Sequence, residues 1–126
     1  MSTTFLTLDE VLALHTHFIA RYGGADGVRD FGMLESALSM PVAGFDGVLL
    51  HPTLHEQAAA YLFHLVKNHP FIDGNKRAAL GTALVFLELN GFAVEASEDE
   101  LVRLTIGAAD GTVSKSEVAV FLRAHS

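Results

Sequence analysis

Apolar residues recur at helical spacing after four short strings in which Ser or Thr precedes Glu by three residues. This pattern is typical of a capping box, in which the Ser or Thr and the Glu together satisfy backbone N–H groups at a helix start. The four boxes are Thr7 to Glu10, Thr53 to Glu56, Ser97 to Glu100 and Ser114 to Glu117. They predict helices that end at Gly23-Gly24, near Asn68, at Asp110-Gly111 and at the chain end.

Two further helices are predicted without a capping box. Asp30 is a suitable N-cap for a short helix through Leu38 that Pro41 halts. A longer apolar helix is predicted from about residue 74 to Leu89, where Asn90-Gly91 ends it.

The remaining segments are predicted as loops or short strands. Apolar residues lie on both sides of Asp46-Gly47, between Pro41 and His51, and this arrangement is typical of a β-hairpin. Phe92 to Val94 is predicted to form one brief strand. The pattern therefore predicts an all-α fold, a compact bundle of about six helices with a short β-hairpin flap.

Composition narrows the class of protein further. The chain has 126 residues with no repeat or linker, which predicts one domain over residues 1–126. Eight Lys and Arg against 15 Asp and Glu give a net charge of -7, which argues against direct nucleic-acid binding. The absence of cysteine excludes disulfides, thiolate metal sites and a cysteine nucleophile. No basic leader or apolar run of roughly 20 residues is present, so we expect no membrane segment and a cytoplasmic location.

The densest group of polar residues runs from His69 to Arg77 and enters a predicted helix. The first turn of a helix presents unpaired N–H groups that bind anions, and Gly74 lets a ligand approach this backbone closely. Asn75, Lys76 and Arg77 add hydrogen-bond donors and positive charge. This is the composition expected of a phosphate site.

Two side chains beside this helix start supply chemistry. Asp73 offers a carboxylate of the kind that binds Mg²⁺ together with substrate phosphates. His69 carries the group whose ordinary pKa suits a general base near neutral pH. Together they indicate a phosphoryl- or nucleotidyl-transferase that acts on a hydroxyl.

A purely structural interpretation also exists for these residues. Asp73-Gly74-Asn75 is an ordinary turn and cap sequence, and Pro70 is an ordinary helix stop. Such a turn, however, needs no Lys or Arg at a helix N-terminus, where the macrodipole disfavours a cation by about 0.3–1 kcal/mol. The cations favour a site that holds an anion.

The stretch from His69 to Arg77 resembles the signature of the Fic/Doc (Fido) superfamily without a gap. That signature reads His, any residue or Pro, Phe, any residue, Asp or Glu, Gly or Ala, Asn, Gly or Lys, and Arg. Two further segments, Gly27 to Leu38 and Leu84 to Phe92, are similar to the death-on-curing (Doc) branch. The resemblance covers nearly the whole chain.

The resemblance implies a role for each residue of the motif. His69 would be the general base that takes the proton of a target Ser or Thr hydroxyl, and Asp73 would bind Mg²⁺. Phe71 would be a buried anchor of the loop. Gly74, Asn75 and Arg77 would form the anion hole, with Lys76 beside them. The flap residues Phe45, Asp46, Gly47 and Val48 would align a target peptide by strand addition.

Two positions separate the chain from the AMP-transferring Fic pattern. Lys76 stands where those proteins have a second Gly, and Leu80 stands where they have a second Arg. Both are typical of Doc, although Gly74 follows the common Fic pattern where Doc itself has Ala. The resemblance then implies transfer of the γ-phosphate of ATP to a translation factor, elongation factor Tu in the family, and arrest of translation. AMP transfer is the first alternative, and a catalytically inactive partner-binding module is the second.

No string in the chain matches the inhibitory helix of self-inhibited Fic proteins, which has Ser or Thr, four residues later Glu, and then Gly or Asn. The resemblance therefore implies a Phd-like antitoxin as a partner that supplies inhibition in trans.

The other histidines give weaker signals. His51 and His55 are four residues apart, but Pro52 and the helix start at Thr53 favour solvated or capping roles over a metal pair. His64 is predicted to be a satisfied core or boundary histidine rather than a catalytic one.

Overall fold

The computed structural model describes residues 2–126, which form six helices and one two-stranded hairpin. The helices are α1 (Leu8–Tyr22), α2 (Phe31–Ser39), α3 (Leu54–Asn68), α4 (Asn75–Leu89), α5 (Glu98–Asp110) and α6 (Lys115–Ala124). The strands β1 (Gly44–Phe45) and β2 (Val48–Leu49) lie between α2 and α3. The predicted all-α class and the six predicted helices are confirmed.

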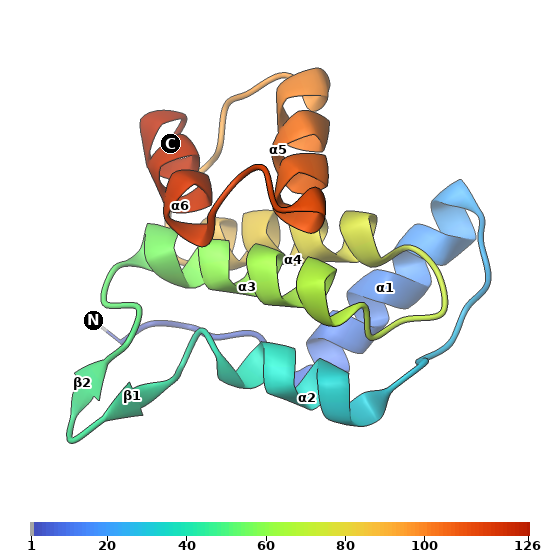
Figure 1. Cartoon of the computed structure of the whole chain (residues 1–126), viewed down its shortest axis with the longest axis horizontal. Helices are drawn as coiled ribbons and strands as arrows, with labels where there is room; N and C mark the ends of the chain where they lie inside the picture. Colours follow the sequence, from blue (N-terminus) through green and yellow to red (C-terminus); the bar gives the residue numbers. More distant parts are fainter. Residues whose placement is uncertain (1) are drawn as a thin grey trace.

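Helices α3 and α4 form the centre of the bundle, with α5 and α6 on one side and α1 and α2 on the other (Figure 1). Small residues let the two central helices pack closely, among them the fully buried Ala59, Ala79 and Ala83. The Tyr61 and Phe86 rings, 5.1 Å apart between centroids, fill the space between these two helices. Because residues 69–74 connect α3 to α4, the polar motif lies at one end of this core. None of the helices that the structure describes has the length and apolarity needed to cross a membrane.

Side-chain caps explain where five of the helices begin. Complete capping boxes form at Thr7, Ser97 and Ser114. At Thr53 the box is only partly formed, because the Glu56 carboxylate accepts the Thr53 hydroxyl at 2.9 Å instead of the backbone N–H. Asp30 caps α2 by accepting the Met33 N–H at 3.0 Å. Helix α4 differs, because its N-cap is Gly74 and no side chain caps it.

The hairpin forms where Asp46-Gly47 predicts it. Gly44 pairs with Leu49 and Phe45 pairs with Val48 in an antiparallel register. Asp46 and Gly47 have φ values of 54° and 79°, so both turn residues lie in the left-handed region, as a type I′ turn requires. The Phe45 side chain is 86% exposed and Val48 is 71% exposed. The hairpin therefore presents apolar side chains to solvent.

The predicted strand from Phe92 to Val94 is wrong. The backbone of this segment bonds to helix ends rather than to a neighbouring strand: the Phe92 N–H donates to the Leu87 carbonyl at 2.9 Å. The Glu95 N–H donates to the His125 carbonyl at 2.7 Å. The Phe92 ring packs edge-on against His55, with centroids 4.8 Å apart. A short apolar run resembles a strand in sequence, but here it ends α4 and leads to α5.

His64 connects α3 to α6. Its Nε2 accepts a hydrogen bond from the Lys115 ammonium at 3.1 Å, which requires the neutral imidazole. Burial, followed by the charges of Lys115 and His51, lowers the pKa of His64 to about 4. The prediction of a boundary histidine is consistent with this position.

We expect the protein to lose stability as the pH falls from about 6.5 toward 4, because of His64. The unfolded chain, with a His64 pKa near 6.5, binds more protons in this window than the folded chain does. The expected loss is about 1–2 kcal/mol after discounting for partial exposure, and unfolding in urea at several pH values measures it. In the matched variant His64→Gln, which keeps an acceptor but does not titrate, the dependence should become shallower. An unchanged pH dependence in this variant would contradict the assignment.

Candidate active site

The loop that carries the motif is held by the segment before α2. His69 ends α3 in the left-handed region, with φ at 48°. Its carbonyl accepts a hydrogen bond from Arg29 Nε at 2.8 Å, and the same guanidinium donates to the Asn68 carbonyl at 3.1 Å. The Pro70 carbonyl accepts the N–H groups of Arg29 and Asp30, at 2.7 and 3.0 Å. These contacts fix the backbone that presents the His69 side chain.

Phe71 is the buried centre of the loop. Its ring is fully buried and lies flat on the His15 imidazole, with centroids 3.8 Å apart and an angle of 5° between the planes. The Asn75 amide bonds to both main-chain groups of Phe71, accepting the N–H at 2.9 Å and donating to the carbonyl at 3.0 Å. The Asn75 side chain therefore stabilises the loop. The backbone N–H of Asn75, at the start of α4, remains available to a ligand.

Asp73 is held through its carbonyl and its carboxylate. His15 Nε2 lies 2.7 Å from the Asp73 carbonyl oxygen. The carboxylate accepts the Gly74 N–H on Oδ1 at 2.8 Å and the Ala25 N–H on Oδ2 at 3.3 Å. Because each carboxylate oxygen has two lone pairs, both oxygens can still bind a cation.

In the described part of the chain, the N-terminus of α4 has no side-chain cap and no bound partner for its first N–H groups. Gly74 provides no cap, and within residues 2–126 the backbone N–H groups of Asn75, Lys76 and Arg77 have no hydrogen-bond acceptor. Neither Lys76 nor Arg77 forms an ion pair with a carboxylate in this part of the chain. Two unpaired cations and three free N–H groups at the positive end of a helix favour a bound anion.

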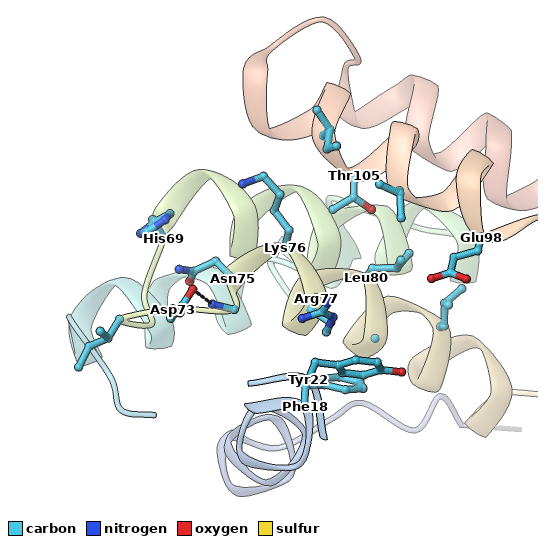
Figure 2. Close-up of a pocket in the computed structure, with 16 residues that line it drawn as sticks. Phe18, Tyr22, His69, Asp73, Asn75, Lys76, Arg77, Leu80, Glu98 and Thr105 are labelled. Atoms are coloured by element: carbon cyan, nitrogen blue, oxygen red, sulfur yellow. Dashed lines mark hydrogen bonds between the residues drawn. The ribbon is translucent and has the colours of Figure 1, made fainter. Parts of the chain in front are cut away.

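A cavity of about 560 Å³ opens over this helix start. Figure 2 shows His69 and Asp73 at one end of it, Arg77 near the middle, and Leu80, Thr105 and Glu98 toward the other end. Its walls come from α1, α4, α5 and the motif loop: Phe18, Tyr22, His69, Ile72, Asp73, Gly74, Asn75, Lys76, Arg77, Leu80, Gly81, Leu84, Glu98, Val102, Thr105 and Ile106. The cavity thus joins a polar, cationic end to a largely apolar one.

Arg77 is supported by α1 rather than by a carboxylate. Its guanidinium carbon lies 4.2 Å from the centroid of the Tyr22 ring, a cation–π contact. The close approach of α1 to α4 depends on Gly81, because a Cβ there would collide with the Phe18 ring. A glycine inside a helix lowers the stability of the helix by about 1 kcal/mol relative to alanine. The contact with Phe18 explains why glycine occupies this position.

Most of the predicted site residues come together in this cavity. His69, Asp73, Gly74, Asn75, Lys76 and Arg77 all line it, and Phe71 lies buried beneath it. The hairpin residues Phe45, Asp46, Gly47 and Val48 do not line it. The hairpin adjoins the N-terminal end of α3, whereas His69 lies at the C-terminal end (Figure 1). Its role in aligning a target therefore stays a prediction.

Residues outside the motif also build the site, and sequence reasoning missed them. They are His15, Tyr22, Gly24, Ala25 and Arg29. The sequence offers two signals: His15 occupies an apolar helical position, and Gly24 belongs to a pair of glycines that predicts a helix stop. Neither signal identifies its partner, because the contacts with Asp73 span about half of the chain.

The fold and the site define a Fic-type domain, in which the motif loop connects two central helices. The family model described as Fic/DOC matches residues 5–87. The chain belongs to the Fic/DOC family. It is 42% identical over 117 residues to "Protein kinase doc" of Escherichia phage P1, covering 91% of this chain and 90% of that protein. It is 35% identical over 128 residues to "Toxin Doc" of Mycolicibacterium smegmatis, covering 97% and 96%. These relatives place it in the Doc branch.

Proposed function

We propose that this protein is a toxin of a toxin–antitoxin pair that acts as a protein kinase. It transfers the γ-phosphate of ATP to a Ser or Thr hydroxyl of a translation factor, elongation factor Tu by family resemblance, and so arrests translation. The observation that carries the proposal is the uncapped α4 N-terminus, with its unpaired Lys76 and Arg77, beside His69 and Asp73 in one cavity. The name of the phage relative, a protein kinase, supports the reaction class.

Asp73 fits a Mg²⁺ site by the chemistry of its donors. Mg²⁺ prefers oxygen ligands, keeps several waters and is often bound through one carboxylate and substrate phosphates. Both Asp73 oxygens retain free lone pairs, and the side chain is exposed in the cavity. Within residues 2–126 no group of three acidic or histidine side chains could hold a metal ion without the nucleotide. A bound Mg²⁺ would supply charge neutralisation to the phosphates.

His69 and the α4 N-terminus would carry out complementary tasks in the transfer. His69 accepts the proton of the target hydroxyl as the new O–P bond to the γ-phosphorus forms. The bond from the γ-phosphorus to the β–γ bridging oxygen breaks, and ADP leaves with the electron pair. The free N–H groups and Arg77 stabilise the charge on the transferred phosphoryl oxygens, which is the main contribution that a protein makes to such a reaction.

The residues Lys76 and Leu80 favour γ-phosphate transfer over AMP transfer. Both line the cavity. The Lys76 side chain occupies space that a glycine would leave to a longer run of phosphates. Leu80 offers no bidentate fork for a second phosphate, as an arginine would.

Incubation with ATP labelled at either the α or the γ position tests the proposal. Purified protein, Mg²⁺ and elongation factor Tu should give a target that carries the γ label only, with one ADP formed per label incorporated. A target that carries the α label would instead establish AMP transfer. The absence of both labels on elongation factor Tu and in a cell extract would refute an enzymatic function.

The apolar end of the cavity supports inhibition by a partner in trans. Val102 and Ile106 of α5 are each 43% exposed and face the cavity together with Leu80 and Leu84 of α4. An amphipathic helix is the usual ligand of such a groove. A Phd-like antitoxin is the proposed source of this helix, because the chain has no inhibitory motif of its own.

A further inference from the structure

The Asp73 carboxylate lies against Gly24, two residues after the end of α1, where the chain has no side chain. A Cβ placed on Gly24 would lie 2.7 Å from Asp73 Oδ2 and 3.2 Å from Asp73 Cγ. Real Cβ atoms essentially never come within 3.0 Å of another heavy atom, so the 2.7 Å approach to Oδ2 means that a substitution at Gly24 must displace the carboxylate or the backbone. The next residue, Ala25, donates its N–H to the same Oδ2 at 3.3 Å.

The same helix also holds the main chain of Asp73. His15 is buried, and its Nε2 lies 2.7 Å from the Asp73 carbonyl oxygen. Together with the Ala25 N–H, which holds the carboxylate, this contact fixes both the carbonyl and the carboxylate of Asp73 from the side of α1. On its other side, the Asp73 Oδ1 accepts the Gly74 N–H (Figure 2). The direction of the carboxylate is therefore set by contacts from α1 and from the start of α4.

We propose that Gly24 is a positioning residue for the Asp73 carboxylate. The absence of a side chain at Gly24 allows Asp73 Oδ2 to lie against the backbone of residues 24–25 and leaves its free lone pairs directed into the cavity. This inference rests on the proposed function in assigning a divalent cation to Asp73. Second-sphere contacts of this kind typically change metal affinity by about 10–100-fold when removed.

The chain contains a closely matched control for this position. Gly23 and Gly24 both have φ in the left-handed region, at 89° and 114°, so alanine introduces backbone strain at either position. A Cβ on Gly23 would meet no atom within 4 Å, whereas a Cβ on Gly24 meets the Asp73 carboxylate and also lies 3.1 Å from Ile19 Cδ1. Comparing Gly24→Ala with Gly23→Ala thus separates displacement of the carboxylate from strain at the helix end.

Two measurements that need no turnover test the proposal. The first is the amide signal of Gly74 in ¹H–¹⁵N spectra of the metal-free protein, because this N–H bonds to Asp73 Oδ1 and is distant in sequence from Gly24. The second is the affinity for Mn²⁺ as a paramagnetic probe in the presence of ADP. Gly24→Ala should shift the Gly74 signal and weaken Mn²⁺ binding roughly tenfold, and Gly23→Ala should change neither. Equal effects of the two substitutions would overturn the proposal.

A double-mutant cycle keeps the test decisive if Gly24→Ala folds poorly. In an Asp73→Ala background the carboxylate is absent, so the excess loss of melting temperature caused by Gly24→Ala over Gly23→Ala should shrink to the part that comes from the Ile19 contact. An excess loss that is equally large with and without the carboxylate would refute the proposed contact. These results are independent of the labelled-ATP assay: if that assay fails while the Gly74 shift is observed, the kinase function is wrong and the positioning role stands.

Discussion

Replacement of His69 by alanine is expected to lower the rate of phosphate transfer by roughly 10²–10⁴-fold, the usual contribution of a positioned general base. The expected effect is on the chemical step, because the groups proposed to hold the nucleotide belong to α4 rather than to His69. Single-turnover transfer of the γ label to the target measures it. Nucleotide affinity, measured with a nonhydrolysable ATP analogue, should change by less than about threefold, because a group that acts only in the chemical step contributes little to nucleotide binding.

The backbone of His69 makes a second variant necessary. Its φ of 48° is unfavourable for alanine, so a loss of activity in His69→Ala could reflect a displaced loop. Asparagine tolerates this conformation and lacks a base of suitable pKa. His69→Asn should therefore be as inactive as His69→Ala while keeping the melting temperature close to that of the unmodified protein. An active His69→Asn variant would show that His69 is not the base.

The same variants separate an enzyme from a binding module in cells. Expression of the unmodified chain without an antitoxin should arrest growth, and expression of His69→Asn at equal level should not. Growth arrest that survives this substitution would favour the inactive partner-binding module, which would use the cavity only to hold a partner.

Helix starts were predictable because each is encoded within four residues. The boxes at Thr7, Ser97 and Ser114 form as the sequence indicates, with both side chain-to-backbone bonds present. The box at Thr53 forms only in part, yet the helix begins at the predicted place, because a single cap from Thr53 is sufficient. The strand predicted at Phe92 failed because its backbone partners, Leu87 and His125, lie on the ends of two helices that no local pattern relates to this segment.

The site was predictable only where its residues are contiguous. The string from His69 to Arg77 contains the proposed base, the Asp73 carboxylate and the helix start, and the fold brings these into one cavity. The supports of the string come from other elements. Arg29 holds the loop across 40 positions, and His15 reaches Asp73 across 58. An apolar-face histidine and an exposed arginine are common in sequences, so only the three-dimensional contact reveals what each of them does.

Phe71→Ala is expected to destabilise the fold by about 3–5 kcal/mol, the range measured for truncation of a buried phenylalanine. Phe71 is fully buried, its ring covers the His15 imidazole, and its main chain is tied to Asn75. Truncation therefore leaves a cavity and removes the surface on which His15 rests. Unfolding in urea, analysed for both midpoint and slope, measures the change.

Two controls distinguish loss of core packing from a general effect of removing an aromatic ring. Phe31→Ala, at a ring that is 54% exposed on α2, should cost less than about 1 kcal/mol. Phe71→Leu keeps most of the volume and should recover much of the loss, to within about 1.5 kcal/mol of the unmodified protein. A loss below about 1 kcal/mol in Phe71→Ala would mean that the motif loop is not anchored through this ring. The position of Asp73 would then depend on its contacts with His15, with the Ala25 N–H and with the Gly74 N–H.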